Sequence, residues 1–570
     1  MFYKNKQEGL RPGGAISKIW RLFKIGRPSK IGCLSLIGSL VLPLGSLIFF
    51  LVLLSFFLPL ILSFLPLFSS RFDFSHITGV KSSFDFSHIF RITVFTVSQA
   101  FFSALLACTV GFAAAYLCAR KNFRGRKFLM ALSSVPLCVP AIIVALSFII
   151  FFGNNGILNS FLKSLLNQDE PPINFLFSMP GVIIIHGFYN FPLAMKTIAQ
   201  VWERLSEDEP NAALLLGASK FRIFKTITFP ALLNSIAVSF LLIFLFCFFS
   251  FIIILLFGGL ATTTLEVELY KAARTKLDMN LAAKIALTEI SAALILILIY
   301  SNLQKKMRVQ NENLKGIRER SAIKGLRQKI FFGLTIFIII LFLIAPLFSI
   351  FLHSTYNVNY TSIFNKFFYF KAWKNVFLSR TFWTALWTSI KIGTLTALVS
   401  LAASLCFAYI TVFYKWRKIY ALLPYLPLAV SSIMLGFGWL LLRPNGTEVI
   451  LIFAQSSLAW PFAWTQIQTS LLRIPQNIIN AAVLLSPDKK TAFFKVIVPL
   501  CKRGIFSSLA FVFAISAGDA SLPIVLNIPR FNNLALLIFD YASSYRFVES
   551  SAVAVVLSLI TGFVFFLQEK

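Results

Sequence analysis

The sequence predicts an all-α integral membrane protein with about twelve transmembrane helices in two parallel, pseudo-symmetric six-helix halves. Three observations lead to this prediction. Hydrophobic residues make up 58% of the 570 residues and charged residues only 13%, far fewer than a soluble domain carries. Many separate apolar runs of about 20 residues are each long enough to cross a bilayer core. Finally, a moderately polar segment occurs twice, 269 residues apart, with apolar runs on both sides of each copy.

The apolar runs set the predicted spans. In the first half (43–302) they lie at about 43–68, 93–118, 128–152, 178–200, 231–257 and 280–302. In the second half (330–570) they lie at about 330–352, 382–411, 419–442, 448–469, 504–527 and 548–567. A basic N-terminal tail (1–42) precedes the first half, and a basic linker (303–329) separates the halves. The apolar stretch after the tail is too long for a cleaved signal peptide, so we expect it to remain as a span.

The net charge of +32 is concentrated in Lys and Arg clusters that recur on alternate sides of the predicted spans. They lie in the tail, in the loop 120–127, in the linker and in the loop 415–418. This distribution follows the positive-inside rule and is typical of contact with anionic lipid. It indicates a lipid bilayer, and no nucleic acid, as the partner of these residues, and it predicts that both termini are cytoplasmic.

Two features suggest metal or disulfide chemistry, and neither is specific. The seven cysteines are scattered and form no C-x-x-C pair. A short segment, Phe72–Ile77, recurs as Phe84–Ile89, so that two His and two Asp lie in one predicted outer loop. Tandem duplication of a tolerant loop is the preferred interpretation over a metal site. We therefore predict no catalytic residue, no metal ligand and no cofactor-binding residue.

The repeated segment has the pattern of two short helices joined by a turn. The first copy contains Asn211, Ala212, Ala213 and Gly217 and ends at Pro230; the second contains Asn480, Ala481, Ala482 and Ser486 and ends at Pro499. The alanines favour helix, and glycine or Ser-Pro ends it. One such amphipathic segment is compatible with a helix lying on the membrane surface. Two copies in matching register favour a shared cytoplasmic partner, contacted by loops 203–230 and 472–499.

Both segments resemble the cytoplasmic coupling loop of bacterial ABC importer permeases, whose motif runs from Glu-Ala-Ala through Gly to Ile-x-Leu-Pro. The matching residues are Ala212, Ala213, Gly217, Ile227 and Pro230 in the first copy and Ala481, Ala482, Ile497 and Pro499 in the second. Asn211 and Asn480 replace the Glu, and Ser486 replaces the Gly, which leaves the polar details of docking open. The resemblance implies that each loop inserts a coupling helix into one of two ABC ATPase subunits at the cytoplasmic face.

Other segments resemble fused permeases for thiamine and for ferric iron. Ala261–Tyr270 is similar to both, whereas Ser98–Leu106, His186–Pro192, Ala385–Ser389, Ser516–Asp519 and Ser543–Arg546 are more similar to the thiamine branch. The resemblance implies import of thiamine or its phosphate esters across the bacterial inner membrane. It also implies a periplasmic or lipid-tethered solute-binding protein at the outer face. A permease for ferric iron or another small solute is the alternative.

The sequence contains no G-x-x-x-x-G-K-[ST] loop, and the dipeptide Gly-Lys never occurs. We therefore predict a transport subunit that is not itself an enzyme, with ATP and magnesium bound by the partner ATPases. An ion-coupled secondary transporter is the alternative from a different class. It would need intramembrane carboxylates or broken helices, and Asp519 is the main candidate.

Four polar residues fall within predicted spans. Asp519 lies near the middle of the eleventh run, where a charge costs about 3 kcal/mol, and its counterpart in the first half is Ser250. His186, Tyr189 and Asn190 precede Pro192 on the fourth run. A position lining the solute pathway and a role in hydrogen bonding between helices are both open for these residues.

Overall fold

The computed structural model describes residues 31–68, 86–131, 139–258, 263–313, 320–356, 370–414 and 418–569. The basic tail up to residue 30, the first copy of the duplicated loop (Phe72–Ile77) and linker residues 314–319 lie outside the described residues. Helices make up almost all regular structure in the described part. The exception is a two-residue parallel ladder that pairs β1 (Lys121–Asn122) with β2 (Ser321–Ala322). The all-α prediction is confirmed.

The helices are named in chain order. The first half contains α2 (Ile31–Leu62), η2 (Leu65–Leu67), α4 (Phe86–Arg120), α5 (Arg126–Ala131), α7 (Ala141–Phe152), α8 (Ile157–Leu166), α9 (Met179–Trp202), α10 (Asp208–Leu215), α11 (Lys220–Ile223), η5 (Phe224–Thr228), α12 (Phe229–Phe248), α13 (Ile252–Phe257), α14 (Leu265–Tyr270), η6 (Lys271–Thr275) and α15 (Met279–Asn313). The second half contains α16 (Leu326–Ile339), η7 (Ile340–Ile344), α17 (Ala345–Ser354), α19 (Lys371–Leu378), α20 (Arg380–Phe413), η8 (Lys418–Ala429), α21 (Ser432–Leu442), α22 (Glu448–Leu471), α23 (Gln476–Leu485), α24 (Lys489–Ala492), η9 (Phe493–Ile497), α25 (Val498–Leu500), α26 (Lys502–Ala517), α27 (Ser521–Leu526), α28 (Leu534–Ser543) and α29 (Phe547–Glu569).

The element bounds repeat at the same offset as the sequence motif. Helices α9 and α22 begin and end 269 positions apart, and so do α11 and α24, and α13 and α27. The π-helical turns η5 and η9 also keep this offset. Because the elements recur in the same chain order and register, the two halves are copies of one folding unit.

The number of spans is slightly lower than the sequence predicts. By length and composition, nine helices in the described part are able to cross a membrane, or up to eleven if each of two bent pairs is one span. The bent pairs are η8 with α21, at 87°, and the segment Lys489–Leu500 with α26, at 74°. The predicted span 448–469 corresponds to α22, which is long enough but is less apolar than the nine because it carries residues such as Gln455 and Ser456.

The third predicted span is displaced along the chain. The sequence places its start at 128, whereas the candidate span in the structure begins at Ala141, the first residue of α7. Pro140 occupies the N-cap position of α7. Proline is suited to this position because it lacks the N–H that a helix interior needs.

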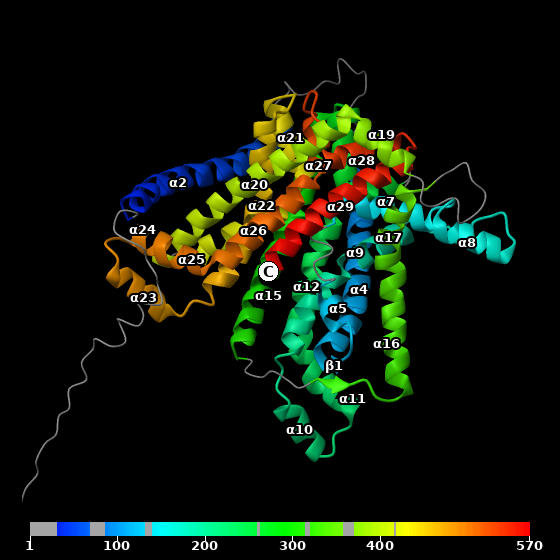
Figure 1. Cartoon of the computed structure of the whole chain (residues 1–570), viewed down its shortest axis with the longest axis horizontal. Helices are drawn as coiled ribbons and strands as arrows, with labels where there is room; N and C mark the ends of the chain where they lie inside the picture. The colour runs from blue at the N-terminus through cyan, green and yellow to red at the C-terminus, as the bar shows by residue number, and fades with distance from the viewer. Residues whose placement is uncertain are drawn as a thin grey trace, which may run out of the picture.

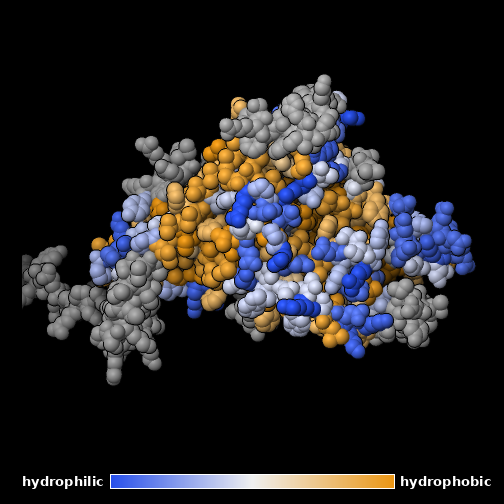
Figure 2. Space-filling view, turned by 90° about the horizontal axis from the view of Figure 1, so that it is seen from above, coloured by the Kyte–Doolittle hydropathy of each residue, from blue (hydrophilic) through white to orange (hydrophobic). Residues whose placement is uncertain are grey.

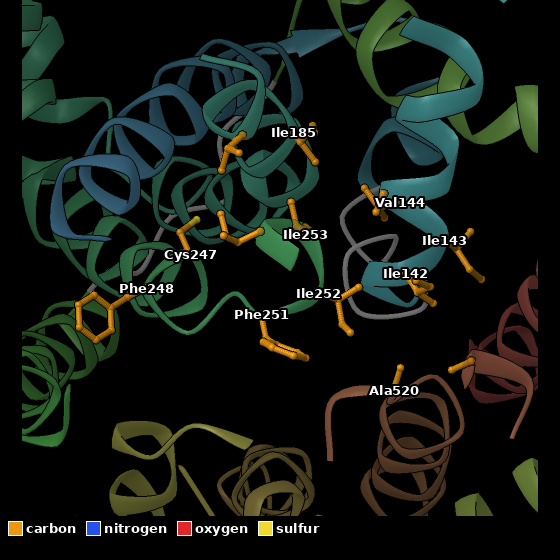
Figure 3. Packing of buried hydrophobic residues seen from close by; sticks show 14 of the residues in the cluster. Ile142, Ile143, Val144, Ile185, Cys247, Phe248, Phe251, Ile252, Ile253 and Ala520 are labelled. Carbon is orange, nitrogen blue, oxygen red and sulfur yellow. The ribbon is translucent and has the colours of Figure 1, made fainter. Parts of the chain in front are cut away.

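Two groups of helices diverge from a shared region (Figure 1). One contains α4, α9 and α12, and the other contains α20, α22 and α26, with the shared region near α21, α27 and α28. The halves interlock, because α2 packs on α20, α21 and α22, while α17 lies against both α7 and α29. A single buried apolar cluster extends through both halves. Figure 3 shows Ile142, Ile252 and Ala520 approaching one another from three different elements.

The outer surface of the molecule has separate apolar and polar areas. Figure 2 shows apolar residues on both sides of a polar area near the centre of the body, and further polar residues at the right-hand tip, where α8 and its following loop project. The connection that contains α8 runs from Gly153 to Ser178, whereas its counterpart between α21 and α22 runs only from Arg443 to Thr447. The insertion therefore lengthens the first half without changing its packed helices.

Two carboxyl groups are buried together where α14 and α15 meet the second half. Glu266 is 0% exposed and Glu289 is 1% exposed. They lie near each other and near the Ser431 hydroxyl, yet none of their four oxygen atoms has a hydrogen bond of good geometry. Glu268, two residues along α14, instead lies 2.5 Å from Lys276 Nζ and 3.6 Å from His88 Nε2. Two adjacent buried carboxylates repel each other and lose hydration, so at least one of the unpaired acids holds a proton.

We expect Glu289→Gln to raise the free energy of unfolding by about 1–2 kcal/mol, because the neutral amide removes the repulsion between the two buried carboxyl groups. The matched control is Glu268→Gln, which removes the acid that faces Lys276. It should lower stability by about 1 kcal/mol, since that lysine is half exposed. Thermal melting of the purified protein in detergent at neutral pH measures both. A fall in melting temperature for both variants would show that both buried acids are charged and paired.

Candidate functional site

The first coupling loop is a helix, a left-handed turn and a second helix. Ala212 and Ala213 lie in α10, and Gly217 follows with φ of 84°. Glycine adopts this conformation without the steric cost that other residues pay. The Gly217 N–H donates to Leu214 O at 3.0 Å, and the next N–H, of Ala218, donates to Ala213 O at 3.0 Å. These bonds close the end of α10 and direct the chain into α11.

The second coupling loop makes the same reversal without a left-handed residue. Ala481 and Ala482 lie in α23, and Ser486 is extended, with φ of −102° and ψ of 147°. Asp488 then caps α24 by accepting a hydrogen bond from the Thr491 N–H at 2.7 Å. Hydrogen bonds from Thr491 hold the pKa of the Asp488 carboxyl below its usual value. The replacement of glycine by Ser486 therefore changes the path of the turn but not the two-helix form of the loop.

Each loop ends its first helix with an exposed pair of leucines. Leu215 and Leu216 are 90% and 89% exposed, and Leu484 and Leu485 are both 84% exposed. The two pairs occupy matching positions at the 269-residue offset. Helices α10 and α23 lie at the far ends of the two helix groups, away from α21, α27 and α28 (Figure 1). Two equivalent apolar tips therefore project from the molecule.

The remaining predicted loop residues are placed on the same surfaces. Asn211 and Asn480 are exposed, and Asn480 Oδ1 accepts a hydrogen bond from Gln476 Nε2 at 3.3 Å. Pro230 and Pro499 are exposed in the first turns of α12 and α25. In both loops the small residues thus lie beside the leucine pair, and the closing proline marks the return into the bundle.

A charged cluster holds the first loop to the mid-chain linker. Glu203 contacts Arg126 through a charged hydrogen bond and lies 3.3 Å from Arg320. Glu207 lies 3.9 Å from Arg120. The β1–β2 ladder joins the linker to the loop 120–127, which also carries Arg126 and Arg120. Sequence analysis missed this cluster; its only signal is the pair of acids at the start of loop 203–230, facing otherwise basic segments, and the second loop has Leu472 where the first has Glu203.

Asp519 lies at a break between helices rather than inside a continuous one. Helix α26 ends at Ala517, and α27 begins at Ser521. One oxygen of the Asp519 carboxyl group, Oδ1, accepts from the Ser521 N–H at 2.9 Å, and Oδ2 accepts from Gln455 Nε2 at 3.0 Å. Gln455 Oε1 in turn accepts from the Ser516 and Thr396 hydroxyls. The predicted span 504–527 is therefore broken where its charge lies.

The first half has an equivalent polar cluster that is neutral. His186 Nδ1 lies 3.1 Å from Gln99 Oε1, and His186 Nε2 lies 2.8 Å from Ser250 Oγ. Gln99 Nε2 donates to Cys247 O at 2.8 Å, so its Oε1 is free to accept from the imidazole. At the 269-residue offset, His186 corresponds to Gln455 and Ser250 to Asp519. The two clusters therefore occupy matching breaks, after α12 and after α26.

A cavity of about 300 Å³ lies between the halves. Its lining comes from α7, α9, α13, α21, α22, α26 and α27 and includes Tyr189, Gln455, Phe462, Ser516 and Asp519. Tyr189 donates its hydroxyl hydrogen to Val139 O at 2.9 Å. His186 and Asn190 are not among the lining residues; both are buried, and Asn190 Nδ2 donates to His186 O at 3.0 Å. Two of the four predicted pathway residues thus face the cavity, and two pack between helices.

Two interlocked repeats, a projecting two-helix loop in each and a cavity between them are the features of a two-half membrane permease. Residues 107–309 match the family described as "Binding-protein-dependent transport system inner membrane component". Together with the relatives described next, this match supports a fused permease of an ABC importer, a multi-pass inner membrane protein. Permeases of this family are transport subunits, and they work with ATPase subunits and solute-binding proteins.

Curated relatives align over most of the chain. It is 25% identical over 503 residues to the "Thiamine transport system permease protein ThiP" of Escherichia coli (strain K12), which covers 85% of this chain and 89% of the relative. It is 24% identical over 492 residues to the protein of the same name from Haemophilus influenzae, covering 83% and 87%. The Brucella abortus (strain 2308) protein of that name is 23% identical over 483 residues, covering 83% and 86%. The similarity therefore includes both halves.

Proposed function

We propose that this chain forms the transmembrane pathway of an importer that carries thiamine or its phosphate esters into the cytoplasm. ATP hydrolysed by two separate subunits would drive the movement. The proposal rests on the names of the relatives for the solute and on the two coupling loops for the mechanism. The observation that carries the mechanism is the matched pair of leucine tips, each exposed by more than four fifths of its surface.

The loops supply the contact through which ATP hydrolysis changes the permease. A Leu-Leu tip beside small alanines fits an apolar groove, because the small residues allow close approach. The start of loop 203–230 is held to the linker by the contact of Glu203 with Arg320, so a movement of the loop would be transmitted to both halves. In this proposal the basic loops and both termini lie in the cytoplasm, ATP and magnesium bind to the ATPase subunits, and a periplasmic or lipid-tethered binding protein delivers solute to the outer face.

The cavity between the halves is the proposed solute pathway. It is lined from both halves, so any change in the angle between the two helix groups alters its access. Its volume of about 300 Å³ lies at the lower end of the range for small-molecule sites. In this proposal Tyr189 and Asp519 line the pathway, whereas His186 and Asn190 hold α9 against its neighbours.

The test is coexpression of this chain with the ATPase and binding protein from neighbouring genes. We expect the ATPase to copurify with the permease. Liposomes containing the complex should take up labelled thiamine only when ATP is present on the side of the membrane that carries the ATPase. Uptake of labelled iron without uptake of thiamine would show that the transported solute is ferric iron. Uptake driven by an ion gradient, with no copurifying ATPase, would overturn the proposal in favour of a secondary transporter.

A further inference from the structure

We propose that the cavity between the halves is a binding site for an organic monocation, with the Asp519 carboxylate as its counter-charge. This inference rests on the proposed function with thiamine itself as the solute, because thiamine is a monocation whereas the phosphate groups of its esters cancel or exceed that charge. It goes beyond that function by assigning recognition of the solute to the permease itself, at a defined group, and not to the binding protein alone.

The cavity has an uncompensated negative charge. Of the described residues that line it, Asp519 alone is charged, and none is a lysine or an arginine. The ion pairs in the described part of the chain do not include Asp519. A carboxylate within low-dielectric walls attracts a cation more strongly than it does in water. The cavity therefore favours a positively charged occupant over a neutral or anionic one of the same size.

The hydrogen bonds around Asp519 orient its carboxyl group and oppose the cost of burying its charge. Both carboxyl oxygens accept from N–H groups, one of Ser521 and one of Gln455, and such bonds favour the ionised form. The orientation of the Gln455 amide follows from its other contacts, since the Ser516 and Thr396 hydroxyls donate to its oxygen and leave the nitrogen to face Asp519. Neither donor carries a positive charge, so the carboxylate keeps its full charge for an occupant.

Comparison of the halves shows that this charge is not required by the fold. The equivalent break in the first half is closed by neutral groups, with Ser250 in the place of Asp519 and His186 in the place of Gln455. Gln99 and His186 of that cluster are buried, and none of its residues lines the cavity. The same backbone break is thus built once without a charge and once with a carboxylate facing the cavity. A purely structural role explains the neutral cluster of the first half. Solute recognition explains why the second half has a carboxylate at the equivalent position.

The other lining residues fit an organic cation better than a hydrated metal ion. Tyr189 and Phe462 contribute aromatic rings, which attract organic cations through their faces. Aliphatic residues such as Ile142, Ile252 and Leu458 make up much of the remaining wall. Within the described residues, no group of three or more His, Cys, Asp or Glu side chains is arranged to hold a metal ion. The class of ligand is a flat or compact organic cation such as a thiazolium.

The experiment compares a cation with its neutral isostere on the purified permease–ATPase complex in lipid nanodiscs, without binding protein. The probes are labelled thiamine and labelled 3-deazathiamine, in which carbon replaces the charged ring nitrogen. We expect the natural complex to bind thiamine at least about tenfold more tightly than the neutral analogue, and Asp519→Asn to remove that preference. Asp519→Glu, which keeps the charge, should retain part of it. Glu448→Gln, which removes a carboxylate paired with Lys391 outside the cavity, is the matched control and should bind as the natural complex does.

The outcomes separate this inference from the proposed function. Equal affinity of the natural complex for the two probes, or no binding of either, overturns the cation site even if the ATPase copurifies and transport continues. The same holds if Asp519→Asn retains the preference for thiamine. If Asp519→Asn does not assemble with the ATPase, the comparison of the two probes on the natural complex and on Asp519→Glu decides. Failure of the natural chain to copurify with any ATPase overturns the proposed function instead.

Discussion

Replacing Leu215 and Leu216 with aspartate, together with Leu484 and Leu485, should abolish capture of the ATPase subunits. Burial of one leucine against a partner contributes about 1.5–3 kcal/mol, so each loop would lose about 3–6 kcal/mol of docking free energy. That loss corresponds to a weakening of at least about a hundredfold at each loop. Copurification of the ATPase with an affinity-tagged permease measures it directly. Each single-loop variant should retain part of the ATPase, because the other tip remains intact.

The permease itself should fold normally in these variants, because the four side chains are already at least 84% exposed. Thermal melting in detergent should therefore match the natural protein. Leu326→Asp is the control, since Leu326 is 74% exposed at the start of α16 but belongs to neither coupling loop. Full retention of the ATPase by the four-residue variant would exclude the leucine tips as the docking surface.

Gly438→Val should prevent the first helix from packing on the second half. A Cβ atom at Gly438 of α21 would lie 2.0 Å from the Pro59 carbonyl oxygen of α2, and that neighbour is backbone. Valine adds two further methyl groups at the same point. Overpacking of this kind costs about 1–3 kcal/mol where neighbours can move, and more where backbone must shift. We therefore expect a fall of at least about 3 kcal/mol in stability, seen as a lower melting temperature and poor recovery of folded protein.

A glycine on the other helix of the same contact provides the control. Gly45 lies in α2, and a Cβ atom there would meet nothing within 4 Å. Gly45→Ala should leave the melting temperature unchanged or raise it slightly, because alanine is the better helix former. If Gly438→Val melts at the same temperature as Gly45→Ala, the close approach of α2 and α21 does not contribute to the fold.

Much of the fold follows from patterns that are local in the chain. Apolar runs are read directly as spans, because a bilayer core requires a minimum length of apolar helix. The errors occur where proline or glycine interrupts such a run. Pro140 shifts the third span, and Gly518 accompanies the break at Asp519. Composition reports the total apolar length, whereas a break depends on single residues whose effect is decided by the surrounding packing.

The coupling loops and the pathway were predictable to different degrees. The two-helix form of both loops was predictable because two copies of one local motif support each other, whereas their role in coupling stays a prediction. The pathway residues could not be sorted in the same way, since His186 and Tyr189 lie on one short stretch of α9 but face different surroundings. The anchor formed by Glu203 was missed because its partners, Arg126 and Arg320, are distant in the sequence.

The sequence by itself determined that this protein is an all-helical membrane permease of two repeated halves with one matching two-helix loop in each. These properties depend on the hydrophobicity and length of apolar segments and on a repeated local motif. Each of these is a property of neighbouring residues in the sequence. Only the tertiary structure decided that α2 of the first half packs against the second half and that α17 of the second half packs against the first. It also decided that Asp519 faces a cavity while His186 is enclosed. Burial and charge compensation depend on which helices meet, and that is set by the shapes of surfaces brought together from distant parts of the chain.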